Sequence, residues 1–350
     1  MPLLKHLEDA GHEIIAIAPE DSYTAKIPYE FHPIPIKSRS LNPLNHLAVL
    51  FKFTKIFRRV KPDIALLYTI HPNTHGNIAA RMTGVRTISN IAGLGSAFID
   101  ERFATRVAKL LYKVALSHPD TVFFQNPTDM KMFRDLGLVS QDKSSRIPGS
   151  GVDLKRFVPE EANPTLKTPF VFLLATRMLW DKGVREFAEA AGAVKQIHKE
   201  VIFRLVGPLG VDNPVALTQE DMRALTESGS VEYAGTSDQM EGVISTAHCI
   251  VLPSYREGLP KILLEAAAMA KPIITTQVPG CEDVVDHGVN GLLCEARNAR
   301  DLEEQMLNIL EMDGTAREEM GIKGRDKIAK EYAQEIVFEH YENAVKAIQI

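Results

Sequence analysis

The sequence predicts an α/β fold with two parallel sheets, each covered by helices. Short apolar runs alternate along the chain with helical patterns, which is typical of βαβ units. The 350 residues are enough for two domains of ordinary size, and 45% hydrophobic with 24% charged residues is a globular composition. A Pro-rich, polar stretch without periodicity at residues 159–169 predicts a linker between the domains.

The expected amino-terminal domain covers residues 1–158. Its first element is a helix that starts at Pro2 and that Gly11 ends, and residues 14–18 follow as a strand. Further strands are expected at residues 64–68 and 121–124. The turn from Asn126 to Asp129 after the latter strand favours a helix cap over a binding site.

The expected carboxyl-terminal domain covers residues 170–335. Residues 329–350 form a final helical pattern, and residues 336–350 are assigned to a terminal helix. The strands of this domain are expected to begin at Phe170, Val201, Val231, Cys249 and Ile273.

Two carboxylates lie eight positions apart, at Glu257 in a loop and at Glu265 in a helix that begins near Pro260. Glu257 follows an apolar strand, and open α/β sheets bind ligands at the carboxyl ends of their strands. The N–H groups of the first helical turn attract anions, so the Gly258-Leu259-Pro260 turn is expected beside a diphosphate. Glu265 lies among apolar residues and needs hydrogen-bond partners, which two ribose hydroxyls would supply. The alternative is a surface loop followed by a core helix.

Arg177 and Lys182 form a second candidate element. Both lie in one loop, between an apolar strand-like run at residues 170–177 and a helical pattern from Val184. Arg offers a rigid fork of donors to a diphosphate, and Lys acts as a point charge. Two solvated surface charges are the alternative. Together with the acidic run, the loop favours a nucleotide-sugar site.

His71 and His75 flank a Pro-Asn turn near the carboxyl end of the strand expected at residues 64–68. They are candidates for contact with a donor or an acceptor, and ordinary polar loop residues are the alternative. Their spacing offers no third ligand, so the sequence predicts no metal site.

Charge is divided unevenly between the two halves. Residues 1–150 carry 19 Lys and Arg against 13 Asp and Glu, whereas the remaining residues carry 21 against 32. Basic amphipathic helices at residues 44–59 and 102–113 predict docking on an anionic membrane surface, with core packing and a solvated face as the alternative. The acidic total and the absence of a recognised motif argue against nucleic-acid binding.

Three cysteines, all in the second half, favour a reducing compartment. No apolar run approaches the roughly 18 residues of a membrane span. The expected location is therefore the cytoplasm, with peripheral association at the inner face of the cytoplasmic membrane.

Several segments resemble family 4 retaining glycosyltransferases of GT-B fold. In the second half these are the Arg177…Lys182-Gly183 loop, the Pro253-Ser254…Glu257-Gly258…Glu265 block and the segment from Gly280 to Gly291. In the first half, residues 68–81, Gly93-Leu94-Gly95, Phe124-Gln125-Asn126 and residues 147–157 are similar to enzymes of capsular-polysaccharide and lipid-linked oligosaccharide assembly. The similarity spans essentially the whole chain.

The resemblance implies two Rossmann-like α/β/α domains that face a cleft, with the terminal helix crossing back to the amino-terminal domain. Catalytic roles fall to Arg177 and Lys182 on the donor diphosphate and to Glu257 beside the donor sugar. The remaining donor contacts are assigned to Gly258, Leu259, Glu265, Gly151 and Tyr233, and the acceptor side to Gly93, Gly95 and His71. Transfer would retain the anomeric configuration by front-face displacement, without a metal or another cofactor.

The substrates are also implied by the resemblance. UDP is the favoured nucleotide, with residues 231–235 lining its base pocket. The transferred sugar would be a hexose or an N-acetylhexosamine, and the acceptor a polyprenyl-diphosphate-linked or other glycan of cell-surface polysaccharide synthesis.

The chain departs from the family at its start. Family members begin with a strand before the helix that here starts at Pro2, and the first strand is central in a doubly wound sheet. The first strand of the amino-terminal domain is therefore expected to be missing. An inactive, truncated nucleotide-sugar-binding protein is one alternative function, and a nucleotide-sugar 2-epimerase of the same fold is another.

Overall fold

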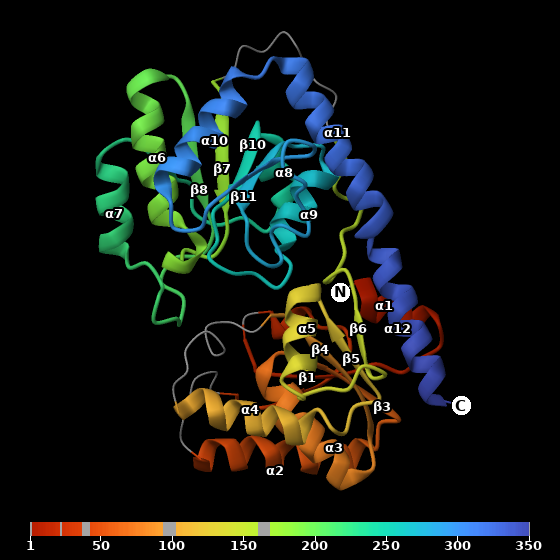
Figure 1. Cartoon of the computed structure of the whole chain (residues 1–350). Coiled ribbons are helices and arrows are strands. Elements are labelled where there is room, and N and C mark those ends of the chain that lie inside the picture. The colour runs from red at the N-terminus through yellow and green to blue at the C-terminus, as the bar shows by residue number, and fades with distance from the viewer. Residues whose placement is uncertain (1, 22, 37–42, 94–102, 160–168, 350) are drawn as a thin grey trace. The chain divides into compact units, whose positions relative to one another are not determined.

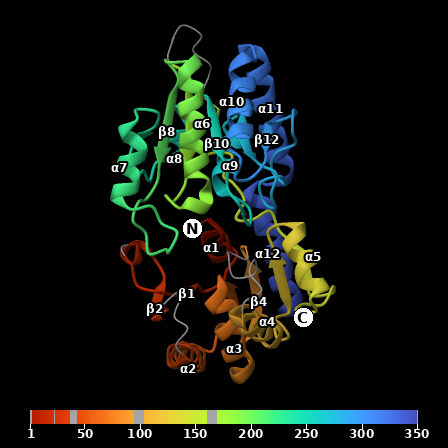
Figure 2. The ribbon, with the colours of Figure 1, turned by 60° about the vertical axis from the view of Figure 1, so that its left-hand side comes forward.

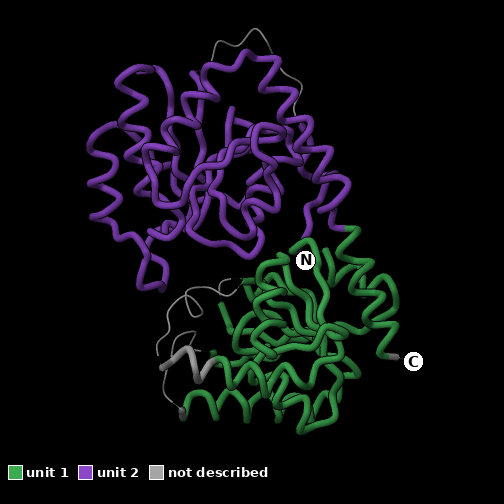
Figure 3. Tube along the Cα trace, viewed as in Figure 1, with its two compact units in different colours: residues 1–149, 335–350 green, residues 150–334 purple. Residues whose placement is uncertain are grey.

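The computed structural model describes residues 2–21, 23–36, 43–93, 103–159 and 169–349. The chain divides into two compact units (Figure 3). Unit 1 holds residues 1–149 and 335–350, and unit 2 holds residues 150–334. The last 16 residues therefore belong to the same unit as the amino-terminal domain, as the family resemblance implied for the terminal helix.

The boundary between the units differs from the sequence-based one. Residues 150–158 were expected in the amino-terminal domain, but Val152 and Phe157 are buried in the core of unit 2. Val152 also forms a β-bridge with Ala333. The unit boundary therefore lies before the buried residues Val152 and Phe157. The sequence placed it later because it relied on the polar composition of residues 159–169. Most of the expected linker, residues 160–168, lies outside the described residues.

The sheet of unit 2 has six parallel strands in the doubly wound order β12-β11-β10-β7-β8-β9 (Figure 1). Chain order reverses between β7 and β10, which lie side by side in the middle of the sheet. Ligands of such sheets bind outside the carboxyl ends of the strands at this switch point. The strands are β7 (Val171–Ala175), β8 (Ile202–Val206), β9 (Glu232–Tyr233), β10 (Cys249–Leu252), β11 (Ile273–Thr276) and β12 (Leu292–Cys294).

Alternate residues of the central strands pack on opposite faces of this sheet. Phe172 and Leu174 of β7 belong to one buried cluster, and Leu173 and Ala175 belong to another. The first cluster lies under α6 (Val184–Ile197), α7 (Gln219–Glu227) and α10 (Ala299–Glu311), and the second under α8 (Met240–Ser245), α9 (Lys261–Ala268) and α11 (Gly314–Glu331). Because both faces are covered, the strands read as continuous apolar runs, as the sequence indicated.

Unit 1 contains two separate parallel sheets. One has four strands in the order β3 (Ile64–Tyr68), β4 (Arg86–Ile91), β5 (Thr121–Phe124) and β6 (Ser144–Arg146). The other pairs β1 (Ile15–Ala18) with β2 (Glu30–Pro33). Within the described residues, no strand joins the two sheets.

The helices of unit 1 begin with α1 (Pro2–Asp9), and Gly11 follows it with a φ of 94°, in agreement with its expected role as a stop. Asn126 caps α5 (Pro127–Asp135) by accepting a hydrogen bond from the Asp129 N–H at 2.7 Å, which confirms the cap. Between α1 and α5 the described helices are the 3-10 helix η1 (Thr24–Lys26), α2 (Pro43–Val60), the π-helix η2 (Pro72–Gly76), α3 (Asn77–Thr83) and α4 (Phe103–Ala115). Figure 2 shows α2, α3 and α4 together along one side of this unit.

The carboxyl-terminal segment is two helices, where the sequence predicted one from residue 329 to 350. Helix α11 ends at Glu331 and α12 (Gln334–Gln349) starts after Tyr332 and Ala333. Tyr332 is buried in unit 2, and its carbonyl accepts from the Val152 N–H at 3.0 Å. This backbone pairing competes with helical hydrogen bonds, so the helix breaks here.

Helix α12 packs in unit 1 through Val337, Tyr341 and Val345, against Ile88 and Phe123 of the four-stranded sheet. The Tyr341 hydroxyl accepts a hydrogen bond from the Asn90 side-chain amide at 2.8 Å. The terminal helix is therefore part of the hydrophobic core of unit 1.

Replacing Tyr341 with Ala should lower the free energy of unfolding by about 3–5 kcal/mol, because it leaves a large cavity in this core. Tyr341→Phe should cost about 1–3 kcal/mol through the unsatisfied Asn90 amide. Urea denaturation followed by circular dichroism measures both. An Ala variant as stable as the wild type would contradict this packing role.

Candidate active site

The loops that follow β7 and β10 bring two of the predicted residues, Lys182 and Glu257, together at the switch point of unit 2. Lys182 lies in the 3-10 turn Trp180–Lys182 after β7, and Glu257 lies in the loop after β10. The Lys182 Nζ lies 2.5 Å from Glu257 Oε1, and only 12% and 14% of the two side chains are exposed. The Ser254 hydroxyl donates to the same carboxylate oxygen at 2.6 Å.

The sequence assigned Lys182 and Glu257 to different parts of a donor, and the structure pairs them. Sequence reasoning did not give Ser254 a role, although it stood in the quoted Pro253-Ser254 motif. Its hydroxyl lies directly after a predicted strand, and that position was the available signal.

Two glycines allow the loops to approach this closely. Gly183 has a φ of 72°, and a Cβ there would lie 2.1 Å from the Pro253 carbonyl oxygen. Gly280 has a φ of 86°, and a Cβ there would lie 2.6 Å from the Gly258 carbonyl oxygen. Both positions combine a left-handed backbone with a contact too short for any side chain. The lack of a side chain at Gly183 and Gly280 therefore allows the loops that carry Lys182 and Glu257 to pack closely against their neighbours.

Arg177 lies two residues after the end of β7 and is exposed. Gly258 and Leu259 are half-buried and lead into α9, whose cap residue is Pro260 and whose first helical residue is Lys261. The helix thus begins near Pro260, as the sequence predicted. Its amino end, with the positive end of the helix dipole, follows the Glu257 loop.

Glu265 is buried in α9, with 5% of its surface exposed, and its Oε1 lies 3.3 Å from Lys261 Nζ one turn earlier. Burial raises the pKa of this carboxyl above its ordinary value, and the neighbouring Lys261 offsets only part of that effect. The carboxylate is therefore held in an environment that disfavours its charge.

Tyr233 ends β9, and its hydroxyl donates to the Gly207 carbonyl at 2.8 Å. Glu232, Tyr233 and Ala234 line a cavity of about 490 Å³ together with residues of β8 and α8. Gly151 lies elsewhere in unit 2, beside the bridge between Val152 and Ala333, and has a φ of 64°. The structure thus brings Lys182 and Glu257 into contact, but the contacts described for Gly151 do not join it to them.

Of the expected acceptor residues, Gly93 follows β4 with a φ of 136°, and Gly95 lies outside the described residues. His71 follows β3 and lies with His75 of η2 and His46 of α2 in one group. One ring nitrogen from each of the three lies within 4.8 Å of the others. His46 is 25 positions from His71, so no local spacing pattern could have identified it.

Burial, reinforced by the neighbouring His71 and His46, lowers the pKa of His75 to about 4. His75 is therefore neutral near pH 7. Its Nε2 lies 3.1 Å from His46 Nδ1.

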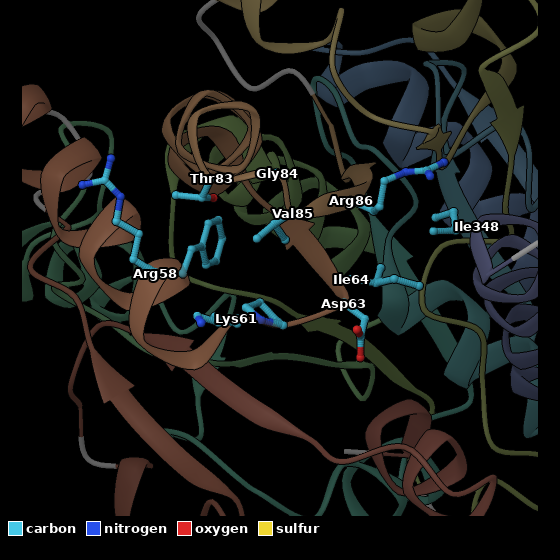
Figure 4. Close-up of a pocket in the computed structure, with 11 residues that line it drawn as sticks. Arg58, Lys61, Asp63, Ile64, Thr83, Gly84, Val85, Arg86 and Ile348 are labelled. Carbon is cyan, nitrogen blue, oxygen red and sulfur yellow. The ribbon is translucent and has the colours of Figure 1, made fainter.

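Unit 1 also contains a cavity of about 780 Å³ at the amino ends of β3 and β4 (Figure 4). Arg58 and Lys61, at the end of α2, lie along it with Asp63 and Arg86. Asp120 pairs with the Arg86 guanidinium through two hydrogen bonds from Nε, of 2.9 and 3.0 Å. Parallel sheets bind ligands at the opposite edge, so this cavity is not assigned to the candidate site.

Comparison with known proteins decides the family. Residues 169–312 match the family model described as glycosyl transferases group 1, and residues 1–126 match that described as glycosyl transferase 4-like. The chain is 31% identical to N,N'-diacetylbacillosaminyl-diphospho-undecaprenol alpha-1,3-N-acetylgalactosaminyltransferase of Campylobacter jejuni, over 97% of this chain and 93% of the relative. The chain belongs to the family 4 glycosyltransferases. The enzyme class and the family expected from the sequence motifs are thereby confirmed.

Two other relatives are also named as glycosyltransferases. It is 24% identical to the capsular polysaccharide biosynthesis glycosyltransferase CapM of Staphylococcus aureus, over 89% of this chain and 83% of the relative. It is 26% identical to UDP-Gal:alpha-D-GlcNAc-diphosphoundecaprenol alpha-1,3-galactosyltransferase of Escherichia coli, over 79% of this chain and 76% of the relative.

Solved structures confirm the GT-B fold. A glycosyltransferase from Rickettsia africae superposes with a TM-score of 0.78 at 17% identity, covering 99% of this chain and 93% of that chain. Anabaena Alr3699/HepE, solved in complex with UDP and glucose, superposes with a TM-score of 0.79 at 16% identity, covering 99% and 95%. The two Rossmann-like units expected from the sequence are those of this fold.

Glu265→Gln should leave the folded glycosyltransferase at least as stable as the wild type at pH 7. The folded-state pKa of Glu265 is raised, so ionisation destabilises the folded state progressively as pH rises above the unfolded-state value of about 4.3. The neutral amide avoids this cost, and its advantage should vanish below about pH 4. Thermal unfolding of the variant and the wild type at pH 4 to 8 measures the difference in their midpoints. The prediction is wrong if the variant loses stability relative to the wild type as the pH rises from 4 to 7.

Proposed function

We propose that this glycosyltransferase moves a hexose or N-acetylhexosamine from a UDP-sugar to a polyprenyl-diphosphate-linked acceptor, with retention of anomeric configuration. The observation that carries the proposal is the joining of Lys182, Glu257 and Ser254 at the switch point of unit 2. The amino end of α9 and the exposed Arg177 lie on the loops of the same two strands.

These groups fit a diphosphate leaving group. Arg177 contributes a planar fork of donors, Lys182 a compact positive charge, and the first turn of α9 oriented N–H groups. Such preorganised donors stabilise the negative charge that develops as the bond to the sugar breaks. In this proposal these groups neutralise the diphosphate without a metal ion.

The proposed reaction is a front-face displacement. The acceptor hydroxyl oxygen bonds to the anomeric carbon as the bond from that carbon to the diphosphate oxygen breaks. The hydroxyl proton passes to the departing diphosphate, and Glu257 positions the donor sugar. The Glu265 carboxylate accepts hydrogen bonds from the ribose hydroxyls. These bonds would give its buried charge the partners it needs. The cavity beside Tyr233 is the proposed site of the base.

The proposed acceptor rests on the relatives and on unit 1. The Campylobacter and Escherichia relatives are named for diphosphoundecaprenol substrates. Unit 1 presents an exposed apolar stripe on α2, made of Leu44, Leu47 and Phe51, with Phe51 71% exposed. On α4, Leu110 and Val114 are exposed as well.

Cations accompany these apolar side chains. Arg58 and Arg59 lie in the last turn of α2, and Lys113 lies in the last turn of α4. Exposed apolar side chains beside Lys and Arg favour an anionic bilayer surface. None of the helices in the described part of the chain has the length and apolar character to span a membrane. We therefore propose peripheral attachment at the cytoplasmic face of the membrane, where polyprenyl-linked substrates are presented.

Arg177→Ala and Lys182→Ala should each lower kcat/KM by at least about 100-fold, since each removes a charge from the departing diphosphate. Transfer from radiolabelled UDP-sugars to a polyprenyl-diphosphate glycan measures this. Lys199→Ala, at an exposed position of the same unit, is the matched control. Sugar conversion in reactions without an acceptor would instead indicate an epimerase.

Calorimetric titration of UDP separates binding from turnover. The wild type should bind one UDP per chain, and an Arg177→Ala/Glu265→Ala double variant should lose detectable binding because it lacks both diphosphate and ribose contacts. Lack of binding by the folded wild type would remove the support for a UDP donor.

Substituting Leu47 and Phe51 together by Ser should abolish sedimentation with vesicles that contain anionic phospholipid. Binding should also fall as salt increases, because part of the attraction is electrostatic. Ile322→Ser on α11, which removes an exposed apolar side chain of unit 2, is the control. Equal vesicle binding by the double variant and the control would reject membrane docking through α2.

A further inference from the structure

Three histidines of unit 1 form a group that the proposed donor chemistry does not use. His46 lies on α2, His71 directly precedes the π-helix η2, and His75 lies within it. We propose that this histidine cluster, His46, His71 and His75, binds one divalent transition-metal ion, with Zn²⁺ as the reference ion. The site lies in unit 1, whereas the donor residues lie in unit 2.

The geometry is close to that of a three-histidine site. One nitrogen of each ring lies within 4.8 Å of the other two, and the closest pair, His46 Nδ1 and His75 Nε2, is 3.1 Å apart. A zinc ion binds imidazole nitrogen at about 2.0–2.1 Å, so two nitrogens at a tetrahedral angle lie about 3.3–3.4 Å apart. The closest pair nearly has this spacing, and the His71 nitrogen, within 4.8 Å of the other two, has to approach them further to bind the same ion.

Hydrogen bonds fix His75 in the tautomer that a metal needs. Its Nδ1 lies 3.3 Å from the His71 carbonyl oxygen and 2.9 Å from the Thr74 hydroxyl. The Thr74 hydroxyl donates to the Ile70 carbonyl at 2.8 Å, so its oxygen is left to accept from His75. Because a carbonyl oxygen only accepts, Nδ1 carries the proton and Nε2 keeps its lone pair toward His46. Metal-binding histidines commonly have such an outer partner.

Other ligands fit the cluster less well. Imidazole nitrogen is the commonest protein ligand of transition-metal ions, and this cluster presents three such rings. Three nitrogen ligands without a carboxylate favour zinc, nickel or copper over magnesium or calcium.

A bound ion would connect two elements of unit 1. Helix α2 contributes His46, and the turn after β3 contributes His71 and His75. Thr69, which lies between β3 and His71, has a left-handed backbone with a φ of 66°. The ion would thus fix the first turns of α2 to the strained segment that follows β3, and metal binding should stabilise unit 1 against unfolding.

The test uses the full chain without a polyhistidine tag, treated with a chelator and then dialysed. Titration with Zn²⁺ by calorimetry should show one site per chain, and Zn²⁺ should raise the thermal unfolding midpoint. Co²⁺ should give the visible absorption of a nitrogen-coordinated ion. His46→Gln and His71→Gln should each weaken Zn²⁺ binding by at least about 100-fold, since each removes a direct ligand, whereas Thr74→Val should weaken it by about 10–100-fold through the outer hydrogen bond.

His198→Gln is the matched control, because it removes a part-exposed histidine of unit 2. Its Zn²⁺ affinity should equal that of the wild type. A cooperative thermal unfolding transition in the absence of metal shows that a variant is folded. A folded wild type that binds no Zn²⁺ would overturn the proposal. Binding unchanged by His46→Gln or by His71→Gln would overturn it as well, because the site would then lack one of its three ligands.

Discussion

The ion pair between Lys182 and Glu257 is the contact on which the candidate site of unit 2 depends. Both side chains are largely withdrawn from water, and removing two charges from water costs free energy that their attraction repays only in good geometry. The pair holds a cation and a carboxylate in fixed positions where β7 and β10 end, as the proposed donor site requires.

The backbone around this pair is built for close approach. Gly183 and Gly280 adopt left-handed conformations against neighbouring carbonyl groups, so the loops after β7 and β10 reach each other without intervening side chains. The doubly wound strand order determines which two loops can meet. The helices α6 and α9 that follow these strands pack on opposite faces of the sheet.

The two units have different chemical characters. Unit 2 contains the paired charges and the buried Glu265, as expected for recognition of a polar nucleotide-sugar. Unit 1 has the basic helices, the exposed apolar stripe of α2 and the histidine cluster. The uneven charge of the two halves was visible in the sequence, but composition alone could not show that Leu44, Leu47 and Phe51 face solvent. Exposure depends on how α2 packs on α3, and that is a tertiary property.

Local patterns in the sequence determined most of the fold and predicted where the candidate donor residues lie along the chain. Apolar runs predicted the strands because both faces of each sheet are covered, and the motifs around Arg177, Lys182, Glu257 and Glu265 follow directly from strand ends and a helix start. The tertiary structure decided what depends on distant contacts. It ended unit 1 before Val152, broke the last helix at Tyr332, paired Lys182 with Glu257 across 75 positions and brought His46 to His71 and His75. Spacing along a chain fixes only neighbours within a few residues, whereas burial and strand order choose which remote side chains meet.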